Sequence, residues 1–289
     1  MAACKVENKR KAPRPGYVYM LRCEGNRLYT GWTDDPASRL HAHKSGKGGA
    51  KFTHAFRPTG FCYLEKLEDK SAALKREAAI KKLPKPKKEA LCAAWAETSR
   101  PRLSVAAAED AGAMQQLYNW YVENSMATFQ TETDTPEAFA RWLADTMAQC
   151  PVLLAKDGTG RLLGFACAHS WYARQAFGWD REITIYCAPD ACGLGVGDKL
   201  YPPLLALLRR LGVWNVYARI TDPNPASEAF HARHGFVCEG RSPRTGYKLG
   251  HWVGLSTWRL TLRGGFAAPG PVMQLPPDEV ETILHQQEK

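Results

Sequence analysis

The chain has 289 residues, of which 45% are hydrophobic and 24% are charged, as is usual in globular proteins. This length exceeds one ordinary domain and allows two compact domains of roughly 90 and 160 residues. No stretch approaches the ~18 consecutive apolar residues of a membrane-spanning helix, and the basic start of the chain lacks the apolar run of a secretory signal. We therefore expect a cytoplasmic protein that makes no membrane contact.

Positive charge is concentrated at the start of the chain. Residues 1–100 hold 22 Lys and Arg against 10 Asp and Glu, whereas residues 101–289 hold 17 against 19, and the formal net charge is +10. A basic region attracts polyanions such as DNA or RNA, with binding that weakens as salt rises. A solvated basic surface that serves only solubility explains the same charge equally well.

The nine cysteines stand singly along the chain. The C-x-x-C pairs that structural metal sites favour do not occur in the sequence. We therefore predict reduced thiols that pack inside the fold.

The first predicted domain covers residues 15–95, between a basic tail at residues 1–14 and a linker at residues 96–102. Alternating apolar residues around the turn-like Glu24-Gly25-Asn26-Arg27 predict a β-hairpin, which a third strand follows. The predicted strands are residues 17–23, 28–33 and 61–67. The predicted helices, the second with Ser71 as its cap, are residues 36–44, 71–83 and 85–95.

From residue 103 to residue 264 the predicted order of elements changes, which indicates a second, mixed α/β domain. Its predicted strands are a short one at residue 103 and residues 152–155, 162–170, 181–187, 213–220 and 251–262. Its predicted helices are residues 111–124, 136–149, 197–211 and 226–234. A Gly- and Pro-rich tail, residues 265–289, contains a short helix at residues 278–287. The fold class is therefore predicted to be α/β (α+β).

The first domain carries five polar side chains of chemical interest, namely Tyr19, Tyr29, Arg39, His43 and Glu77. Glu77 lies between Leu74 and Ile80 on its helix, so a carboxylate occupies the apolar stripe. A charge placed there is costly unless it is paired or holds a metal. Phosphodiester cleavage needs a group that activates water, a cation beside the phosphate and often an oxygen-bound metal. These residue types can fill those roles.

The chain resembles the GIY-YIG nuclease superfamily, and closely its small single-domain bacterial members. The resemblance is carried by the motifs Tyr17-Val-Tyr19 and Tyr29-Thr-Gly31 and by Arg39 and Glu77, which follow them in the sequence. The resemblance implies a small α/β sandwich in which Tyr19 activates water or relays its proton, with Tyr29 as its hydrogen-bonding partner. It also implies that Arg39 contacts the scissile phosphate, that His43 assists and that Glu77 binds Mg²⁺ or Mn²⁺. The departures from the eponymous motifs fall on residues that shape the strands.

Other interpretations of the first domain stay open. Paired tyrosines on a hairpin are usually cross-strand packing, and Arg39 with Glu77 is equally an ion pair. The domain either cuts structured DNA or RNA or only binds it. The basic segments at residues 44–51 and 81–88 supply phosphate contacts in both cases.

In the second domain a glycine-rich turn, Cys192-Gly-Leu-Gly-Val-Gly197, separates a predicted strand from a leucine-rich helix. Glycines let the backbone approach a ligand closely, and the N–H groups at the start of a helix suit a pyrophosphate. A tight turn before a helix is the plain alternative. A dinucleotide-binding fold is disfavoured because no βαβ unit begins the domain.

Three further side chains occupy positions that suit acyl transfer to an amine. Glu182 lies on the strand before the glycine turn, where a carboxylate can take a proton from an amine. Asn224 offers an amide to a peptide-like cofactor arm. His231, four residues before Gly235-Phe236, is placed to return a proton to a thiolate leaving group.

Together with segments such as Gly246-Tyr-Lys-Leu-Gly-His-Trp252, these residues resemble the GNAT superfamily, in its phosphinothricin acetyltransferase branch, over residues 103–264. The resemblance implies a mixed-sheet domain that binds acetyl-CoA and passes the acetyl group directly to an amine, with Glu182 as general base. The cysteine at the start of the turn replaces the Gln or Arg usual in the family. The residues implied to bind the cofactor are Ile185, Cys187, Cys192, Gly193, Leu194, Gly195, Val196, Gly197, Asn224 and Ser227.

The acceptor pocket is predicted from side chains that core packing explains as well. The candidates are Phe129, Tyr172, Arg174, Phe177, Trp179 and Tyr186. An arginine suits an acceptor that bears a carboxylate or a phosphinate. We therefore predict a small, amino-acid-like amine as the acceptor.

The sequence thus predicts an acetyl-CoA-dependent N-acetyltransferase fused to a metal-dependent endonuclease-like domain, with a homodimer through the transferase domain as one arrangement. One alternative is a nuclease or nucleic-acid-binding protein whose second domain is an accessory acetyl-CoA-binding module. A further, non-enzymatic alternative makes the first domain a nucleic-acid tether for the transferase.

Overall fold

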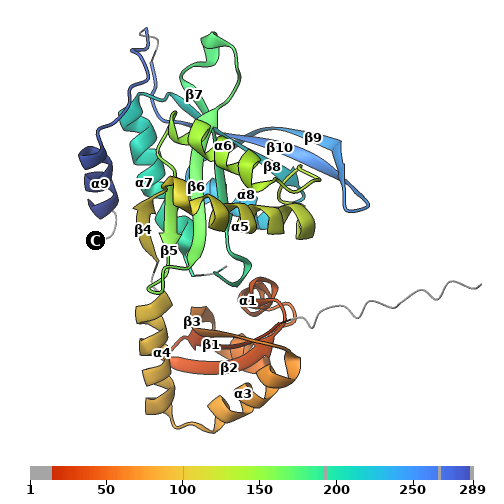
Figure 1. The fold of residues 1–289 in the computed structure, drawn as a ribbon. Helices are drawn as coiled ribbons and strands as arrows, with labels where there is room; N and C mark the ends of the chain where they lie inside the picture. Colours follow the sequence, from red (N-terminus) through yellow and green to blue (C-terminus); the bar gives the residue numbers. More distant parts are fainter. Residues whose placement is uncertain (1–14, 100, 192–193, 266–267, 287–289) are drawn as a thin grey trace, which may run out of the picture. The chain divides into compact units, whose positions relative to one another are not determined.

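The computed structural model describes residues 15–99, 101–191, 194–265 and 268–286. The chain folds into two compact units (Figure 1): of the described residues, 15–99 and Leu194 belong to the first, and 101–191 and those from Gly195 onward belong to the second. We call them the first unit and the second unit. None of the helices in the described parts of the chain is both long and apolar enough to cross a membrane.

The first unit is built on a three-stranded antiparallel sheet with strand order β2-β1-β3. Its strands are β1 (Gly16–Cys23), β2 (Arg27–Thr33) and β3 (Pro58–Leu67). Its helices are α1 (Pro36–Ser45), α2 (Lys51–Ala55), α3 (Lys70–Lys82) and α4 (Lys85–Ser99).

The side chains of β1 alternate between two separate cores, one on each face of the sheet. Val18 and Met20 join a cluster that includes residues of α3 and α4, whereas Tyr19 and Leu21 join a cluster that includes residues of α1 and α2. This is the period-two alternation of a strand with both faces covered. The predicted α/β sandwich is therefore confirmed.

Three details of the first unit differ from the prediction. The Asp69 side chain, rather than Ser71, caps α3 by accepting a hydrogen bond of 2.8 Å from the Ala72 backbone N–H. The short helix α2 was not predicted, and it begins at Lys51, the last residue of the basic segment 44–51. The helix α4 continues to Ser99, beyond its predicted end at Trp95, because residues 96–99 are compatible with a helix although they carry no apolar face.

The second unit contains a seven-stranded mixed sheet with strand order β4-β5-β6-β7-β8-β10-β9. Its strands are β4 (Arg102–Val105), β5 (Leu153–Lys156), β6 (Leu162–Ser170), β7 (Asp180–Cys187), β8 (Asn215–Asp222), β9 (Val237–Lys248) and β10 (His251–Thr261). Neighbouring strands are antiparallel except for β7 and β8, which are parallel.

Helices cover this sheet and share the buried apolar side chains with its strands. They are α5 (Ala111–Asn124), α6 (Pro136–Met147), α7 (Val196–Leu211), α8 (Pro225–Arg233) and α9 (Pro277–Gln286). Short 3-10 turns lie at Ala108–Asp110, Gln175–Phe177 and Pro189–Ala191. The leucine-rich α7 packs on β5 and β6.

The strand β9 was not predicted. Almost all of its side chains are exposed, and it contains Gly240, Pro243 and Gly246. A strand at the edge of a sheet with no buried face carries no apolar alternation, so the sequence gives no periodic signal for it.

Candidate active sites

In the first unit, a glycine makes room for Tyr19. Tyr19 on β1 lies opposite Gly31 on β2 in the antiparallel register. A Cβ atom at position 31 would lie 2.5 Å from the Tyr19 hydroxyl oxygen, which is closer than side chains tolerate. Tyr19 is fully buried. The glycine of the Tyr-Thr-Gly motif therefore has a steric role, because it admits the phenol ring against the neighbouring strand.

A chain of hydrogen bonds determines where the protons lie around Tyr19. The Thr53 hydroxyl donates to the Ala50 carbonyl oxygen at 2.9 Å, so its oxygen accepts from His43 Nδ1, which is 2.8 Å away. His43 Nε2 then carries no proton and accepts from the Tyr19 hydroxyl at 2.7 Å. The Tyr19 hydroxyl therefore has a proton acceptor already in place.

Burial holds both members of this pair in the neutral state near pH 7. Desolvation raises the pKa of Tyr19 to about 12, against the opposing effect of its hydrogen bond to Arg39. Desolvation also lowers the pKa of His43 to about 4, with the Arg39 charge adding to the effect. In the resting state neither the imidazole nor the phenol carries a charge. The neutral imidazole can nevertheless accept the proton of the phenol.

Arg39 lies beside the Tyr19 hydroxyl and is partly exposed to solvent. Its Nε donates to the Tyr19 hydroxyl oxygen at 3.2 Å, and its Nη1 donates to the Gly48 carbonyl oxygen at 3.1 Å. The hydrogen bond to Tyr19 is the main cause that raises the pKa of Arg39. The site therefore presents a permanent cation next to a buried phenol.

Tyr29 contributes ring contacts rather than the hydrogen bond predicted for it. Its ring centroid lies 6.2 Å from that of Tyr19 and 5.1 Å from that of His43. The Tyr19 hydroxyl instead bonds His43 and Arg39. Tyr29 therefore lies beside the rings of Tyr19 and His43, and its role as the hydrogen-bonding partner of Tyr19 stays a prediction.

Glu77 on α3 lies on the inward stripe, although its apolar neighbours there differ from the predicted ones. Ala73 and Ile80 are fully buried, whereas Leu74 is 39% exposed. The Glu77 side chain is 15% exposed and pairs with Lys81 at 2.9 Å. Its charge acts on the phenol, because it is one of the causes that raise the pKa of Tyr19. Glu77 therefore lies within electrostatic range of the Tyr19 site.

The second unit has a sheet in which two neighbouring strands separate part-way along. The parallel ladder between β7 and β8 joins Asp180 to Asn215, Arg181 to Val216 and Glu182 to Tyr217, and continues no further. Both strands go on beyond this point, β7 to Cys187 and β8 to Asp222. Glu182 therefore lies where the two strands part.

Glu182 is held by a two-point ion pair with Arg219 of β8. The Arg219 Nε lies 2.8 Å from one carboxylate oxygen of Glu182, and its Nη2 lies 2.5 Å from the other. The Glu182 side chain is 10% exposed and that of Arg219 is 50% exposed. The guanidinium also stands over the ring of Trp171, 5.5 Å from its centroid. This fork fixes the orientation of the carboxylate.

The start of α7 lies close to β7 and α8. Gly195, with φ 75°, adopts the left-handed conformation at the helix N-cap. A Cβ atom at Gly197 would lie 2.9 Å from the Phe230 ring and 3.5 Å from the Ile185 side chain, so the glycine permits this close packing. Val196 is buried at the same turn. The predicted cofactor residues Gly195, Val196, Gly197 and Ile185 are thus brought together, whereas Cys192 and Gly193 lie outside the described residues.

Asn224 is the N-cap of α8. Its side-chain oxygen accepts a hydrogen bond of 3.2 Å from the Ser227 backbone N–H, which satisfies one of the first helical donors. The cap uses the side-chain oxygen of Asn224 and not its amide nitrogen. On β7, Cys187 lies beyond the end of the ladder, where its carbonyl oxygen accepts from the Tyr121 hydroxyl at 2.7 Å.

Comparisons with known proteins agree with this geometry in both units. Residues 15–90 match the model of the GIY-YIG catalytic domain, and residues 114–236 match that of the acetyltransferase (GNAT) family. A phosphinothricin N-acetyltransferase of Streptomyces coelicolor is 37% identical over 50% of this chain and 86% of its own length. A UPF0213 protein of Syntrophus aciditrophicus is 49% identical over 25% of this chain and 83% of its own length. The chain belongs to the GNAT family. In the sequence, a GIY-YIG domain precedes its GNAT unit.

A solved structure supports the assignment of the GNAT unit. The phosphinothricin acetyltransferase of Sinorhizobium meliloti, in complex with acetyl-CoA, is 28% identical with a TM-score of 0.57, over 62% of this chain and 96% of its own. The predicted GNAT fold and N-acetyltransferase class are therefore confirmed, as is the GIY-YIG fold of the first unit.

The GNAT unit places His231 where it is a poor proton donor. His231 is 4% exposed, and its ring packs against the rings of Tyr201 and Phe236. Desolvation lowers the pKa of His231 to about 4, although a hydrogen bond of 2.8 Å to the Ser227 carbonyl oxygen opposes this shift. The imidazole is therefore neutral near pH 7. Its role as leaving-group acid stays a prediction, which this burial disfavours.

Two of the predicted acceptor residues are already engaged within the GNAT unit. The Trp179 indole N–H donates to the Gly270 carbonyl oxygen at 2.6 Å. Tyr186 packs in an aromatic cluster with Tyr118 and Tyr121, and burial raises its pKa. These two side chains therefore have packing roles in the fold, and their place in the acceptor pocket stays a prediction.

The remaining acceptor candidates are exposed. Tyr172 is 54% exposed and Phe129 is 39% exposed, and Arg174 is also exposed. The Tyr172 ring contacts those of Trp171 and Phe177. Since Trp171 lies beneath Arg219, Tyr172 is linked through it to the Glu182 pair. Tyr172 and Arg174 stay candidates for acceptor contact.

Two residues of the sites were missed from the sequence. Arg219 lies on a strand where a charged residue looks like an ordinary solvent-facing position, and only the parallel pairing of β7 with β8 brings it to Glu182. Thr53 lies on the unpredicted helix α2. The alternation of residues along β8, with Arg219 two positions from Tyr217, was the signal that could have placed the arginine on the Tyr217 face.

Proposed function

We propose that the GNAT unit binds acetyl-CoA with its pyrophosphate at the start of α7 and transfers the acetyl group to the amine of a small amino-acid-like acceptor. The observation that carries the proposal is the position of Glu182 at the point where β7 and β8 separate. Ile185, three residues further along β7 and so about 10 Å away, lies next to Gly197 at the start of α7. A pyrophosphate at the helix start and a thioester near Glu182 are compatible with that spacing.

Acetyl-CoA supplies an acetyl group activated as a thioester. Glu182 accepts the proton that the acceptor amine gives up as it attacks. Arg219 keeps both oxygens of the carboxylate in a fixed orientation. The N–H groups at the start of α7 and the amide of Asn224 hold the cofactor.

The acceptor class rests on the relatives and on the exposed Arg174. Relatives of the GNAT unit are named for phosphinothricin, whose phosphinate and carboxylate each suit a guanidinium. Arg174 is exposed and stands two residues after Tyr172 on the segment between β6 and β7. Arg174 would bind the anionic end of the acceptor while the amine of the acceptor approaches Glu182.

The test is release of free CoA from acetyl-CoA by the full chain with a panel of amines. We expect turnover with phosphinothricin or methionine sulfoximine and none with their N-methylated or amine-free analogues. Calorimetry with acetyl-CoA alone serves as the binding control. Acetyl-CoA binding without turnover on any α-amino acid analogue would contradict the acceptor class and favour an accessory cofactor-binding module.

A second activity is supported by the Tyr19 site. We propose that the GIY-YIG unit cuts a phosphodiester backbone, with Tyr19 taking a proton from water as its own proton passes to His43 Nε2. Arg39, beside the phenol, neutralises charge that develops on the phosphate. The pKa of about 12 makes free tyrosinate rare at pH 7, so the proton must leave Tyr19 in the same step.

Glu77 fits a hard divalent metal as its single protein ligand. Mg²⁺ is often held by one or two carboxylates together with substrate phosphates and water. No cluster of three or more His, Cys, Asp or Glu that could hold a metal occurs in the described parts of the chain. Glu77 would therefore hold Mg²⁺ or Mn²⁺ jointly with the phosphate, where the ion polarises the phosphoryl oxygens.

Nicking of branched or supercoiled DNA by the full chain, with and without Mg²⁺, tests this activity. We expect Arg39→Ala and Glu77→Ala each to lower the rate by about 100-fold or more. Arg57→Ala removes an exposed charge from the same unit and is the matched control. Salt-sensitive binding that survives all three changes, with no cutting by the unaltered protein, would favour a nucleic-acid tether.

A further inference from the structure

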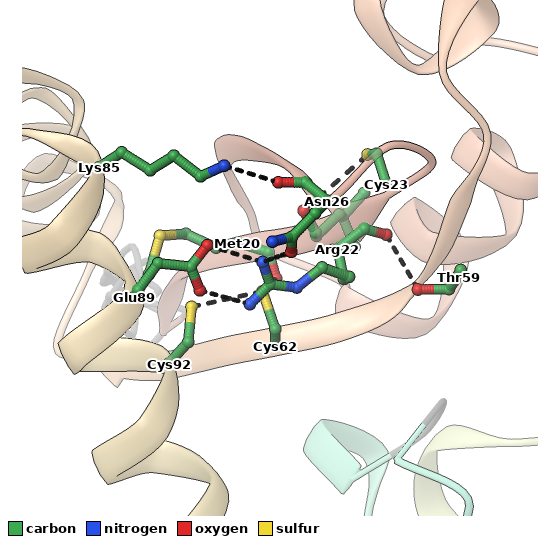
Figure 2. A network of polar contacts seen from close by, with 10 residues as sticks. Met20, Arg22, Cys23, Asn26, Thr59, Cys62, Lys85, Glu89 and Cys92 are labelled. Carbon is green, nitrogen blue, oxygen red and sulfur yellow. Dashed lines mark hydrogen bonds and ion pairs between the residues drawn. The ribbon is translucent and has the colours of Figure 1, made fainter.

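Two cysteines of the first unit lie side by side, although they are far apart in the sequence. Cys62 on β3 and Cys92 on α4 have their Sγ atoms 3.4 Å apart (Figure 2). The Cys62 Sγ also lies 3.4 Å from the Met20 carbonyl oxygen. Both side chains belong to the core between the sheet and α4, where Cys92 is 5% exposed and Cys62 is partly exposed. Neither cysteine belongs to the Tyr19 site or to the GNAT unit.

An ion pair next to the two sulfur atoms fixes α4 against the sheet. The Nη1 and Nη2 atoms of Arg22 lie 2.8 Å and 2.6 Å from the two carboxylate oxygens of Glu89, one turn before Cys92 on α4 (Figure 2). The same Nη1 donates to the Asn26 side chain at 2.7 Å, and the Lys85 Nζ donates to the Asn26 carbonyl oxygen at 3.0 Å. These contacts prevent α4 from sliding along the sheet, so the two sulfur atoms stay adjacent.

Within the pair, the hydrogen bond between the thiols raises the pKa of Cys62 and lowers that of Cys92, so Cys92 is the group that carries the thiolate. The hydrogen bond between the thiols is the largest cause that lowers the pKa of Cys92, with burial opposing it and the Arg22 charge assisting it. Burial raises the pKa of Cys23 in the same unit, and raises that of Cys150 in the GNAT unit to about 12. Thiolates are the reactive form, so these isolated cysteines are poor competitors.

We propose that Cys62 and Cys92 form a reversible intramolecular disulfide, which makes this pair an oxidative modification site of the first unit. A disulfide needs the sulfur atoms at about 2.05 Å, so they must approach by only about 1.3 Å, which small side-chain rotations can provide. The fixed α4 supplies the alignment that most cysteine pairs in a reduced protein lack.

The oxidant is a hydroperoxide, and the reaction balances in two steps. One thiolate attacks the peroxide, so that an S–O bond forms, the O–O bond breaks and the departing hydroxide takes a proton to become water. The second thiolate attacks the sulfenic sulfur, so that the S–S bond forms, the S–O bond breaks and a second water leaves. The two thiols give up two electrons, and one hydrogen peroxide becomes two waters. A dithiol or thiol reductant reverses the bond by exchange.

The cross-link would join β3 to α4, the last helix before the second unit begins. A disulfide removes conformations from the opened state, so the oxidised protein opens α4 less often. Hydrogen exchange of the α4 amides should therefore slow on oxidation. The amides of α1, which lies on the other face of the sheet, should not change.

The test is peptide mapping of the full chain after treatment with hydrogen peroxide and alkylation of the remaining thiols. We expect a cross-linked peptide that contains Cys62 and Cys92, which dithiothreitol removes, and slower hydrogen exchange across α4 in the oxidised protein. Cys62→Ala and Cys92→Ala should each abolish the cross-link. Cys23→Ala, a buried thiol of the same unit, is the matched control and should retain it.

Two results would overturn the proposal. One is recovery of both cysteines in the alkylated, uncrosslinked form after peroxide has oxidised other thiols of the chain. The other is a disulfide that links either cysteine to a different partner. Both are read from the unaltered protein, so a variant that fails to fold does not remove the test.

Discussion

The two units place a proton acceptor in their candidate sites by opposite physical means. In the GIY-YIG unit the phenol of Tyr19 and the imidazole of His43 are both buried and both neutral, and burial shifts their pKa values in opposite directions. In the GNAT unit the Glu182 carboxylate faces a partly exposed guanidinium as a charged pair. The first site therefore depends on packing, whereas the second depends on charge. Substitutions that alter one property should affect one unit and spare the other.

The largest expected effect is the loss of the charged base. Glu182→Gln keeps the shape of the side chain but removes its capacity to accept a proton, so kcat/KM for acetyl transfer should fall by about 100-fold to 10,000-fold. The release of free CoA under saturating acetyl-CoA measures this fall in kcat/KM. Nicking by the same preparation should be unchanged, and unchanged acetyl transfer at every pH would remove Glu182 as the base.

A packing change in the other unit should come next in size. In Gly31→Ala the new methyl group would meet the Tyr19 hydroxyl at 2.5 Å, so the ring must shift and its bond to His43 must lengthen. We expect nicking to fall by about 100-fold and the free energy of unfolding of the first unit to drop by about 1–3 kcal/mol. Acetyl transfer should stay at the level of the unaltered chain.

A smaller loss of activity should follow when the positive charge beside Glu182 is kept but the two-point contact with Arg219 is removed. Arg219→Lys retains a cation near Glu182 but cannot bond both carboxylate oxygens or stack on Trp171 in the same way. We expect kcat to fall by about 10-fold with little change in the KM for acetyl-CoA. Arg209→Lys, on the exposed side of α7, serves as the matched control. A drop confined to the KM for acetyl-CoA would place Arg219 in cofactor binding instead.

The smallest effect is one that both units should share. Folding lowers the pKa of His43 and of His231 to about 4, so between about pH 6.5 and pH 4 the unfolded chain binds protons that the native chain does not. Their contribution to stability is complete above the unfolded pKa and is lost as the pH falls. Urea unfolding should show a loss of about 1 kcal/mol per histidine between pH 6.5 and pH 5. His43→Gln should weaken this pH dependence in the first unit alone.

The sequence was sufficient wherever a local pattern carried the information. Alternation identified the hairpin that holds Tyr19, and the glycine turn identified the start of α7. Glu77 was recognised because a carboxylate on an apolar stripe is unusual, although its apolar neighbours on that stripe were misassigned. Such signals come from residues within two turns of each other.

What the sequence could not supply was pairing at long range. Arg219 and Glu182 are distant in the chain, and their contact depends on the parallel register of two strands. The same is true of Cys62 and Cys92, which the sequence showed as two isolated thiols. The sequence likewise could not show which ring nitrogen of His43 carries the proton, because this depends on Thr53, which lies on a helix with no periodic signal.

The parting of β7 from β8 also bears on how such a protein can evolve. Where hydrogen bonding between two neighbouring strands stops part-way, main-chain groups near the gap can pair with an amide-bearing ligand as they would with a missing strand. Main-chain recognition is indifferent to the side chains on either side of it. The main-chain groups of residues 183–187 can therefore serve a ligand while the surrounding loops change, although the side chains of Ile185 and Tyr186 pack within the unit.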